Sequence, residues 1–156
     1  MADRRADLGA DEPRGVRLGL PAEGPGAVAG LGRRFAALAV DWIAAILLSR
    51  LFFPQLEYGG PESAAAILTI FGAEVFLLTW LTGASFGQRI LGVAVIRVPV
   101  MAPRDPSGQP VRHLGVGRTA LRTLLLCLVI PAVVIDRDGR GLHDRAAGSV
   151  VVRARS

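Results

Sequence analysis

FAALAVDWIAAILLSRLFF, from Phe35 to Phe53, and AAAILTIFGAEVFLLTWL, from Ala64 to Leu81, are two long apolar stretches of this chain. At 19 and 18 residues, each has the length that a helix needs to cross about 30 Å of hydrocarbon. The connection between them, residues 54–63, contains two prolines and two adjacent glycines, which is typical of a tight turn. The sequence therefore predicts a hairpin of two transmembrane helices.

The composition of the whole chain agrees with a membrane environment. Of its 156 residues, 51% are hydrophobic and 20% are charged, and the mean hydropathy is +0.44. The single cysteine, Cys127, excludes an internal disulfide and a cysteine-rich metal site. All 18 positively charged side chains are arginines, which gives a net charge of +5. Because these arginines flank the apolar stretches, we attribute them to membrane topology and expect no nucleic-acid partner.

The arginines also predict the orientation of the hairpin. Six precede the first stretch, none lies in residues 54–63, and four lie between the second stretch and residue 113. By the positive-inside rule, the amino terminus and the segment after Leu81 face the cytoplasm, and residues 54–63 face outward. Arg50 is the exception, and it lies close enough to the outer end of its helix to reach the interface.

A third apolar stretch, residues 119–135, is harder to assign. Arg122 interrupts it, and the 13 uncharged residues that follow contain Pro131. This pattern favours a short membrane-embedded or interfacial helix. The alternative is a third span, which would place the carboxyl terminus and its arginines outside.

The remaining segments complete the expected organisation. Residues 1–32, rich in Gly, Pro and Arg, predict a disordered cytoplasmic tail, and residues 33–153 form the membrane domain. Two β-branched runs, residues 92–98 and 149–153, predict a small cytoplasmic strand pairing. We therefore expect an all-α membrane protein with two transmembrane helices at residues 35–53 and 64–81, a short third helix and a small β element.

Two acidic residues lie inside the predicted spans. In an antiparallel hairpin, Asp41 and Glu74 fall at the same depth, about 9 to 11 Å from the cytoplasmic boundary. A carboxylate in hydrocarbon is normally protonated, paired or hydrated. One interpretation is a structural ion pair with an arginine, for which Arg34, Arg118 and Arg122 are the candidates. The other is a proton or cation site formed by both carboxylates.

One pattern suggests an enzyme, but its context argues against it. Residues 83–87 read GASFG and match the G-x-S-x-G nucleophile motif. A nucleophile elbow follows a strand, whereas a membrane helix precedes this motif. We expect no enzymatic activity, no catalytic residue, no cofactor and no metal site.

Three segments together resemble the bacterial RDD family of membrane proteins: RRFAALAVDWIAA, TGASFGQRILGVAVIRV and GRGLHDRAAGSVVV. The resemblance covers residues 31–153 and identifies the signature arginine and two aspartates as Arg34, Asp41 and Asp144, with Arg33 as an alternative for the first. The stretch that contains Gly87, Gln88, Arg89 and Gly92 is similar to a glycine-bounded motif of the family, with Gln88 where Lys is more usual.

The resemblance implies a multi-pass protein of the bacterial inner membrane with two main spans, and a transporter whose ligand is undefined. We expect a transporter or ion-handling subunit that uses Asp41 and Glu74, acting as a homo-oligomer or with a membrane partner. The alternative is an adaptor that binds anionic lipid or a protein through its arginine-rich face. We also expect Arg34 to bind Asp41 and Asp144 together, because a guanidinium offers five donors.

Overall fold

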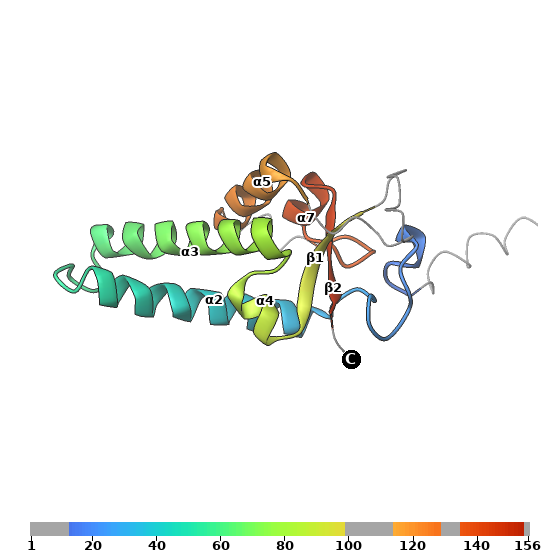
Figure 1. The fold of residues 1–156 in the computed structure, drawn as a ribbon, viewed down its shortest axis with the longest axis horizontal. Coiled ribbons are helices and arrows are strands. Elements are labelled where there is room, and N and C mark those ends of the chain that lie inside the picture. The colour runs from blue at the N-terminus through green and yellow to red at the C-terminus, as the bar shows by residue number, and fades with distance from the viewer. Residues whose placement is uncertain (1–12, 99–113, 129–134, 155–156) are drawn as a thin grey trace, which may run out of the picture.

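Two long antiparallel helices form the extended part of the molecule (Figure 1). The structure is a computed structural model, and it describes residues 13–98, 114–128 and 135–154. Helix α2 (Leu31–Phe52) and helix α3 (Pro61–Thr82) pack against each other and contain 22 residues each. Pro61 is the first residue of α3, where its missing N–H leaves no helical hydrogen bond unmade. Both helices are long and apolar enough to cross a membrane, which confirms the predicted pair of long apolar helices.

Both helices expose large apolar residues, and α2 buries small and polar ones. On α2, Ala37, Asp41, Ala45 and Ser49 form a buried stripe with four-residue spacing. By contrast, Leu51 is 70% exposed. Water would penalise such a surface, whereas lipid chains would solvate it, and small residues in the stripe let the helices approach closely.

A short helix and a two-stranded sheet lie at one end of the hairpin. Helix α4 (Phe86–Ile90) follows α3 and leads into strand β1 (Val93–Arg97). Strand β1 pairs antiparallel with β2 (Ser149–Arg153), and Val95 lies opposite Val151. The predicted strand pairing is thus confirmed. We call the end of the hairpin that carries this sheet, formed by Leu31 and Thr82, the sheet end.

The segment before α2 packs on the sheet, which differs from the expected disordered tail. It contains a 3-10 turn, η1 (Val16–Leu18), and then runs along β2. The N–H of Ala29 donates to the carbonyl of Val151, and Val28 forms a bridge with Val152. Because this strip buries Val28 and Ala29 against the strands, the prediction is wrong for residues 13–30. Residues 1–12 lie outside the described part of the chain.

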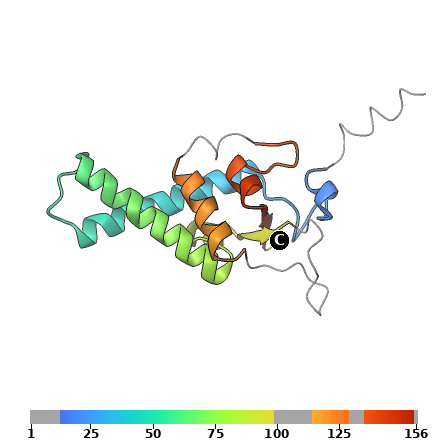
Figure 2. The same ribbon diagram turned by 90° about the horizontal axis from the view of Figure 1, so that it is seen from above.

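Two further helices cover the sheet end. Helix α5 (Val116–Cys127) packs on α3 and on α7 (Leu142–Ala146), and Figure 2 shows it lying across the sheet end of α3. The predicted apolar segment 119–135 is helical up to Cys127, and its residues 129–134 lie outside the described residues. With 12 residues, α5 extends about 18 Å, which is less than the hydrocarbon thickness.

Helix α5 also buries polar residues and exposes apolar ones. Its buried face carries Thr119, Arg122 and Thr123, whereas Leu124 and Leu128 are 66% and 65% exposed. A helix on a water-facing surface shows the opposite arrangement. The buried polar side chains of α5 therefore resemble those of α2.

Candidate functional site

The carboxylate of Asp41 is held by the first turn of α4. Asp41 is 3% exposed, and its Oδ2 accepts a hydrogen bond of 2.6 Å from the Ser85 hydroxyl. Its Oδ1 accepts one from the Gly87 N–H. A buried carboxylate requires such donors, because unpaired charge in an apolar environment is strongly unfavourable. Helix α4 thus provides the polar partners that the apolar stretch around Asp41 lacks.

The glycine-bounded motif builds this turn. Ser85 and Gln88 form a capping box, in which the Ser85 N–H donates to the Gln88 side chain at 3.0 Å and the Gln88 N–H donates to the Ser85 hydroxyl at 3.3 Å. Gly87 lies against α2, where an added Cβ would be 2.1 Å from the carbonyl oxygen of Ala37. Only glycine allows this approach. Arg89 is exposed, and Gly92 joins α4 to β1 with a positive φ of 65°.

Glu74 binds the same turn from the other helix. The Phe86 N–H donates to Glu74 Oε1 at 2.8 Å, between the residues that contact Asp41. The two carboxylates are therefore at one level of the hairpin, as the sequence predicts. Glu74 Oε2 is buried, and no residue in the described ranges donates a hydrogen bond to it.

Asp144 is the centre of a second polar cluster. It is fully buried and forms ion pairs with Arg34 and with Arg122, whose Nε lies 3.0 Å from Oδ1. The Nε2 atom of His143 lies 3.3 Å from the same oxygen. Burial by itself would raise the pKa of Asp144, but the charges of Arg122, His143 and Arg34 outweigh it and lower the pKa below its ordinary value.

The expected cluster of Arg34 with both signature aspartates forms only in part. Arg34 pairs with Asp144 and donates to the carbonyl of Gly139, whereas Asp41 is held by Ser85 and Gly87. The second cation on Asp144 is Arg122. From the sequence, Arg122 was a candidate partner of Asp41 and Glu74, not of Asp144. Its position inside an apolar run was the signal that it is buried with a partner.

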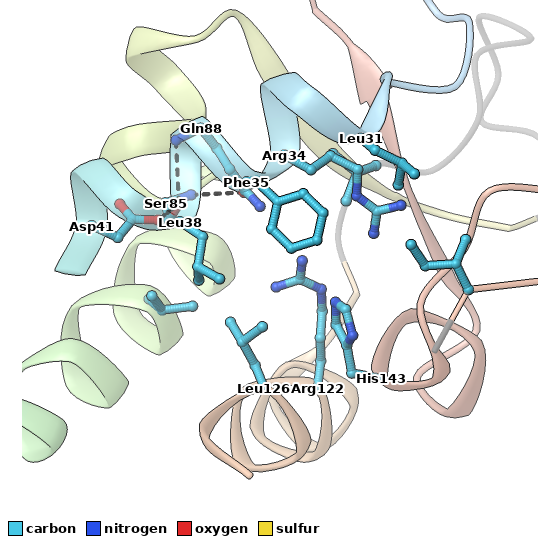
Figure 3. A pocket seen from close by; sticks show the side chains of 13 residues that line it. Leu31, Arg34, Phe35, Leu38, Asp41, Ser85, Gln88, Arg122, Leu126 and His143 are labelled. Atoms are coloured by element: carbon cyan, nitrogen blue, oxygen red, sulfur yellow. Dashed lines mark hydrogen bonds between the residues drawn. The ribbon is translucent and has the colours of Figure 1, made fainter. Parts of the chain in front are cut away.

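A cavity of about 50 Å³ lies between the two clusters (Figure 3). The guanidinium groups of Arg34 and Arg122 and the ring of His143 face it from one side, and Asp41, Ser85 and Gln88 border the other. Apolar side chains form the rest of the wall: Leu31, Phe35, Leu38, Val75, Leu126, Ile135 and Val151. Arg122 is 2% exposed, and its NH1 atom has no hydrogen-bond partner among the residues described.

The serine motif has a structural role in this arrangement. The Ser85 hydroxyl donates to Asp41 and caps α4. A serine hydrolase also uses an acid and a histidine later in the chain, for which the sequence offers Asp136 and His143. Asp136 accepts hydrogen bonds from the Arg140 N–H at 2.8 Å and from its Nε at 3.1 Å.

The fold thus combines two helices that are long and apolar enough to cross a membrane with buried ion pairs from α2 and α5 to Asp144 on α7. The chain belongs to the RDD family, whose model matches residues 28–148. Neither a curated protein nor a solved structure matches the sequence.

Proposed function

We propose that this protein is an ion-handling subunit of a transporter in the bacterial inner membrane, and that Asp41 and Glu74 carry a proton. The observation that supports this most directly is the meeting of two carboxylates, one from each apolar helix, at Ser85–Gly87. Two nearby carboxylates in a low-dielectric environment favour a shared proton, because both are costly to ionise together.

Ser85 is suited to both protonation states of Asp41. A hydroxyl can donate to an ionised carboxylate, and after rotating it can accept from a protonated one. The Gly87 N–H can donate to Oδ1 in either state. Both oxygens of Asp41 can therefore keep a hydrogen-bond partner in either protonation state, which favours a group that gains and loses a proton.

The proposed topology places the sheet end in the cytoplasm. The arginine-free connection, residues 54–63, lies at the opposite end of the hairpin. Helix α5 would lie in the inner interface with Leu121, Leu124 and Leu128 toward lipid, since these residues are exposed and apolar. One hairpin encloses little volume, so we propose that several copies, or a membrane partner, complete the path.

Proton flux into proteoliposomes tests this function. Purified protein is reconstituted into liposomes that contain a pH-sensitive dye, and an imposed ion gradient drives proton uptake. We expect Asp41→Asn and Glu74→Gln to reduce flux at least tenfold, because neither amide can release a proton. Glu62→Gln is the matched control, since Glu62 is an exposed acid at the start of α3, and it should retain the wild-type rate.

Thermal denaturation in detergent accompanies each flux measurement. Glu74→Gln keeps the acceptor oxygen for the Phe86 N–H, so it should change stability little. Wild-type flux no greater than that of empty liposomes, or undiminished flux in both variants, would reject the transporter and leave the lipid- or protein-binding adaptor as the better explanation.

A further inference from the structure

The buried arginine on α5 has an unused donor that faces a cavity. Arg122 contacts Asp144 through Nε, while its NH1 atom is buried and has no partner in the described part of the chain. Its guanidinium points into the space bordered by Arg34 and His143 (Figure 3). Leaving a charged donor unpaired in a protein interior is costly, which favours a bound acceptor there.

The charges around this cavity determine which ligand it can accept. Arg34 and Arg122 contribute two positive charges, and Asp144 and Asp41 contribute two negative charges when both are ionised. The carboxylate of Asp144 is already engaged by both arginines. When Asp41 is protonated, these four groups carry one excess positive charge, and a protonated His143, which borders the same cavity, adds to it. The surroundings therefore attract a negative charge.

We propose that this cavity is a binding site for one small monovalent anion, and that the anion enters together with a proton on Asp41. This proposal rests on the proposed function and extends it. A cavity of about 50 Å³ exceeds the roughly 10–15 Å³ that one water molecule needs, so it accommodates a halide but not a large organic anion. The apolar wall, which includes Phe35, Leu38 and Leu126, favours an anion that loses its hydration readily over sulfate or phosphate.

Other charged groups near Asp41 influence whether its carboxyl group is protonated. Glu74 faces it from α3 at a distance where their charges interact, and Arg122 does so from α5. Arg34, on α2 itself, and His143, on α7, border the same cavity. An anion beside Arg122 weakens the attraction of that arginine for the Asp41 carboxylate. By linkage, anion binding therefore favours protonation of Asp41, and protonation favours the anion.

Equilibrium binding of radioactive chloride to the purified protein in detergent tests the proposal. Sodium gluconate keeps the ionic strength constant, because gluconate is too large for the cavity. We expect saturable binding that strengthens as the pH falls. Arg122→Gln should weaken binding at least about tenfold, as expected for the loss of a charged hydrogen-bond donor. Arg118→Gln, one turn earlier on the exposed side of α5, is the matched control and should bind as the wild type does.

Two further variants separate binding from folding. Arg122→Lys keeps a positive charge and should retain part of the affinity if Arg122→Gln fails to fold. Asp41→Asn mimics the protonated acid, so it should bind chloride with little dependence on pH. The absence of saturable binding between pH 5 and pH 8 would mean that the cavity holds water only, and equal affinity in wild type and Arg122→Gln would exclude Arg122 as the anion-binding residue.

The outcomes distinguish this proposal from the proposed function. Proton flux that depends on Asp41 without chloride binding rejects the anion site and keeps the proton carrier. Chloride binding that is insensitive to both pH and Asp41→Asn rejects the coupling to the proton.

Discussion

Replacing Gly87 by alanine tests the contact between α4 and α2. An added Cβ would lie 2.1 Å from the Ala37 carbonyl oxygen and 2.9 Å from Asp41 Oδ1, so α4 must move away from α2. Overpacking of this kind costs about 2 kcal/mol. Displacing the Gly87 N–H from the Asp41 carboxylate adds about 2 kcal/mol, and the better helix propensity of alanine returns about 1 kcal/mol. The expected net destabilisation is about 3 kcal/mol.

Thermal unfolding in detergent, followed by circular dichroism, measures this effect. For a chain of this size, about 3 kcal/mol corresponds to a fall of roughly 6–12 °C in Tm. Gly32→Ala is the matched control, because Gly32 is also the second residue of its helix and an added Cβ would meet nothing within 4 Å. It should leave Tm unchanged or slightly raised. Equal Tm values for the two variants would refute the close approach of Gly87 to α2.

Three other predictions concern the polar clusters. Asp144→Asn should destabilise the protein by about 3–5 kcal/mol, because it leaves Arg34 and Arg122 buried without their carboxylate, as chemical denaturation can measure. Because folding lowers the pKa of Asp144, its carboxylate stabilises the protein above about pH 4, and this stabilisation is lost as the pH falls through the folded pKa. The wild type and Asp144→Asn should therefore converge in stability in acid. A constant difference between them down to about pH 2 would contradict this. In double-mutant cycles, the losses of unfolding free energy caused by Arg34→Gln and Asp144→Asn should be strongly non-additive, because the two residues form an ion pair. The losses caused by Arg34→Gln and Asp41→Asn should be nearly additive. Strong coupling between Arg34 and Asp41 would instead mean that both aspartates share Arg34. Ser85→Ala should lower stability by about 1–3 kcal/mol through loss of the cap and of the Asp41 bond, and Ser85→Thr should restore most of it in the same unfolding assay.

The contacts of α4 with Asp41 could not be predicted from the sequence around α4 alone. The glycine-bounded motif can be recognised in the sequence, but the need for glycine at Gly87 comes from the carbonyl of Ala37, which lies 50 residues earlier in the chain. The capping box could have been read from Ser85 and Gln88, since their spacing is characteristic. The second function of Ser85, as a donor to Asp41, depends on how α4 docks on α2 and has no local signal.

The segment before α2, residues 13–30, also owes its structure to a contact that is distant in the sequence. Its glycines and prolines disfavour helix and led to the prediction of a disordered tail. Whether an extended chain is disordered or adds to a sheet depends on whether a strand edge with unpaired donors and acceptors is within reach. Here β2 provides that edge for Ala29 and Val28.

By itself, the sequence determined the two apolar helices, their connection, the strand pairing and the common level of Asp41 and Glu74. These features follow from length, periodicity and spacing along the chain, which are local quantities. Only the tertiary structure decided which cation serves which acid. Arg34 and Arg122 are 88 residues apart, yet both reach Asp144, and Asp41 is held by backbone and hydroxyl donors instead. Ion pairing in a buried site depends on three-dimensional distance and on competing donors, and neither is encoded in the order of residues alone.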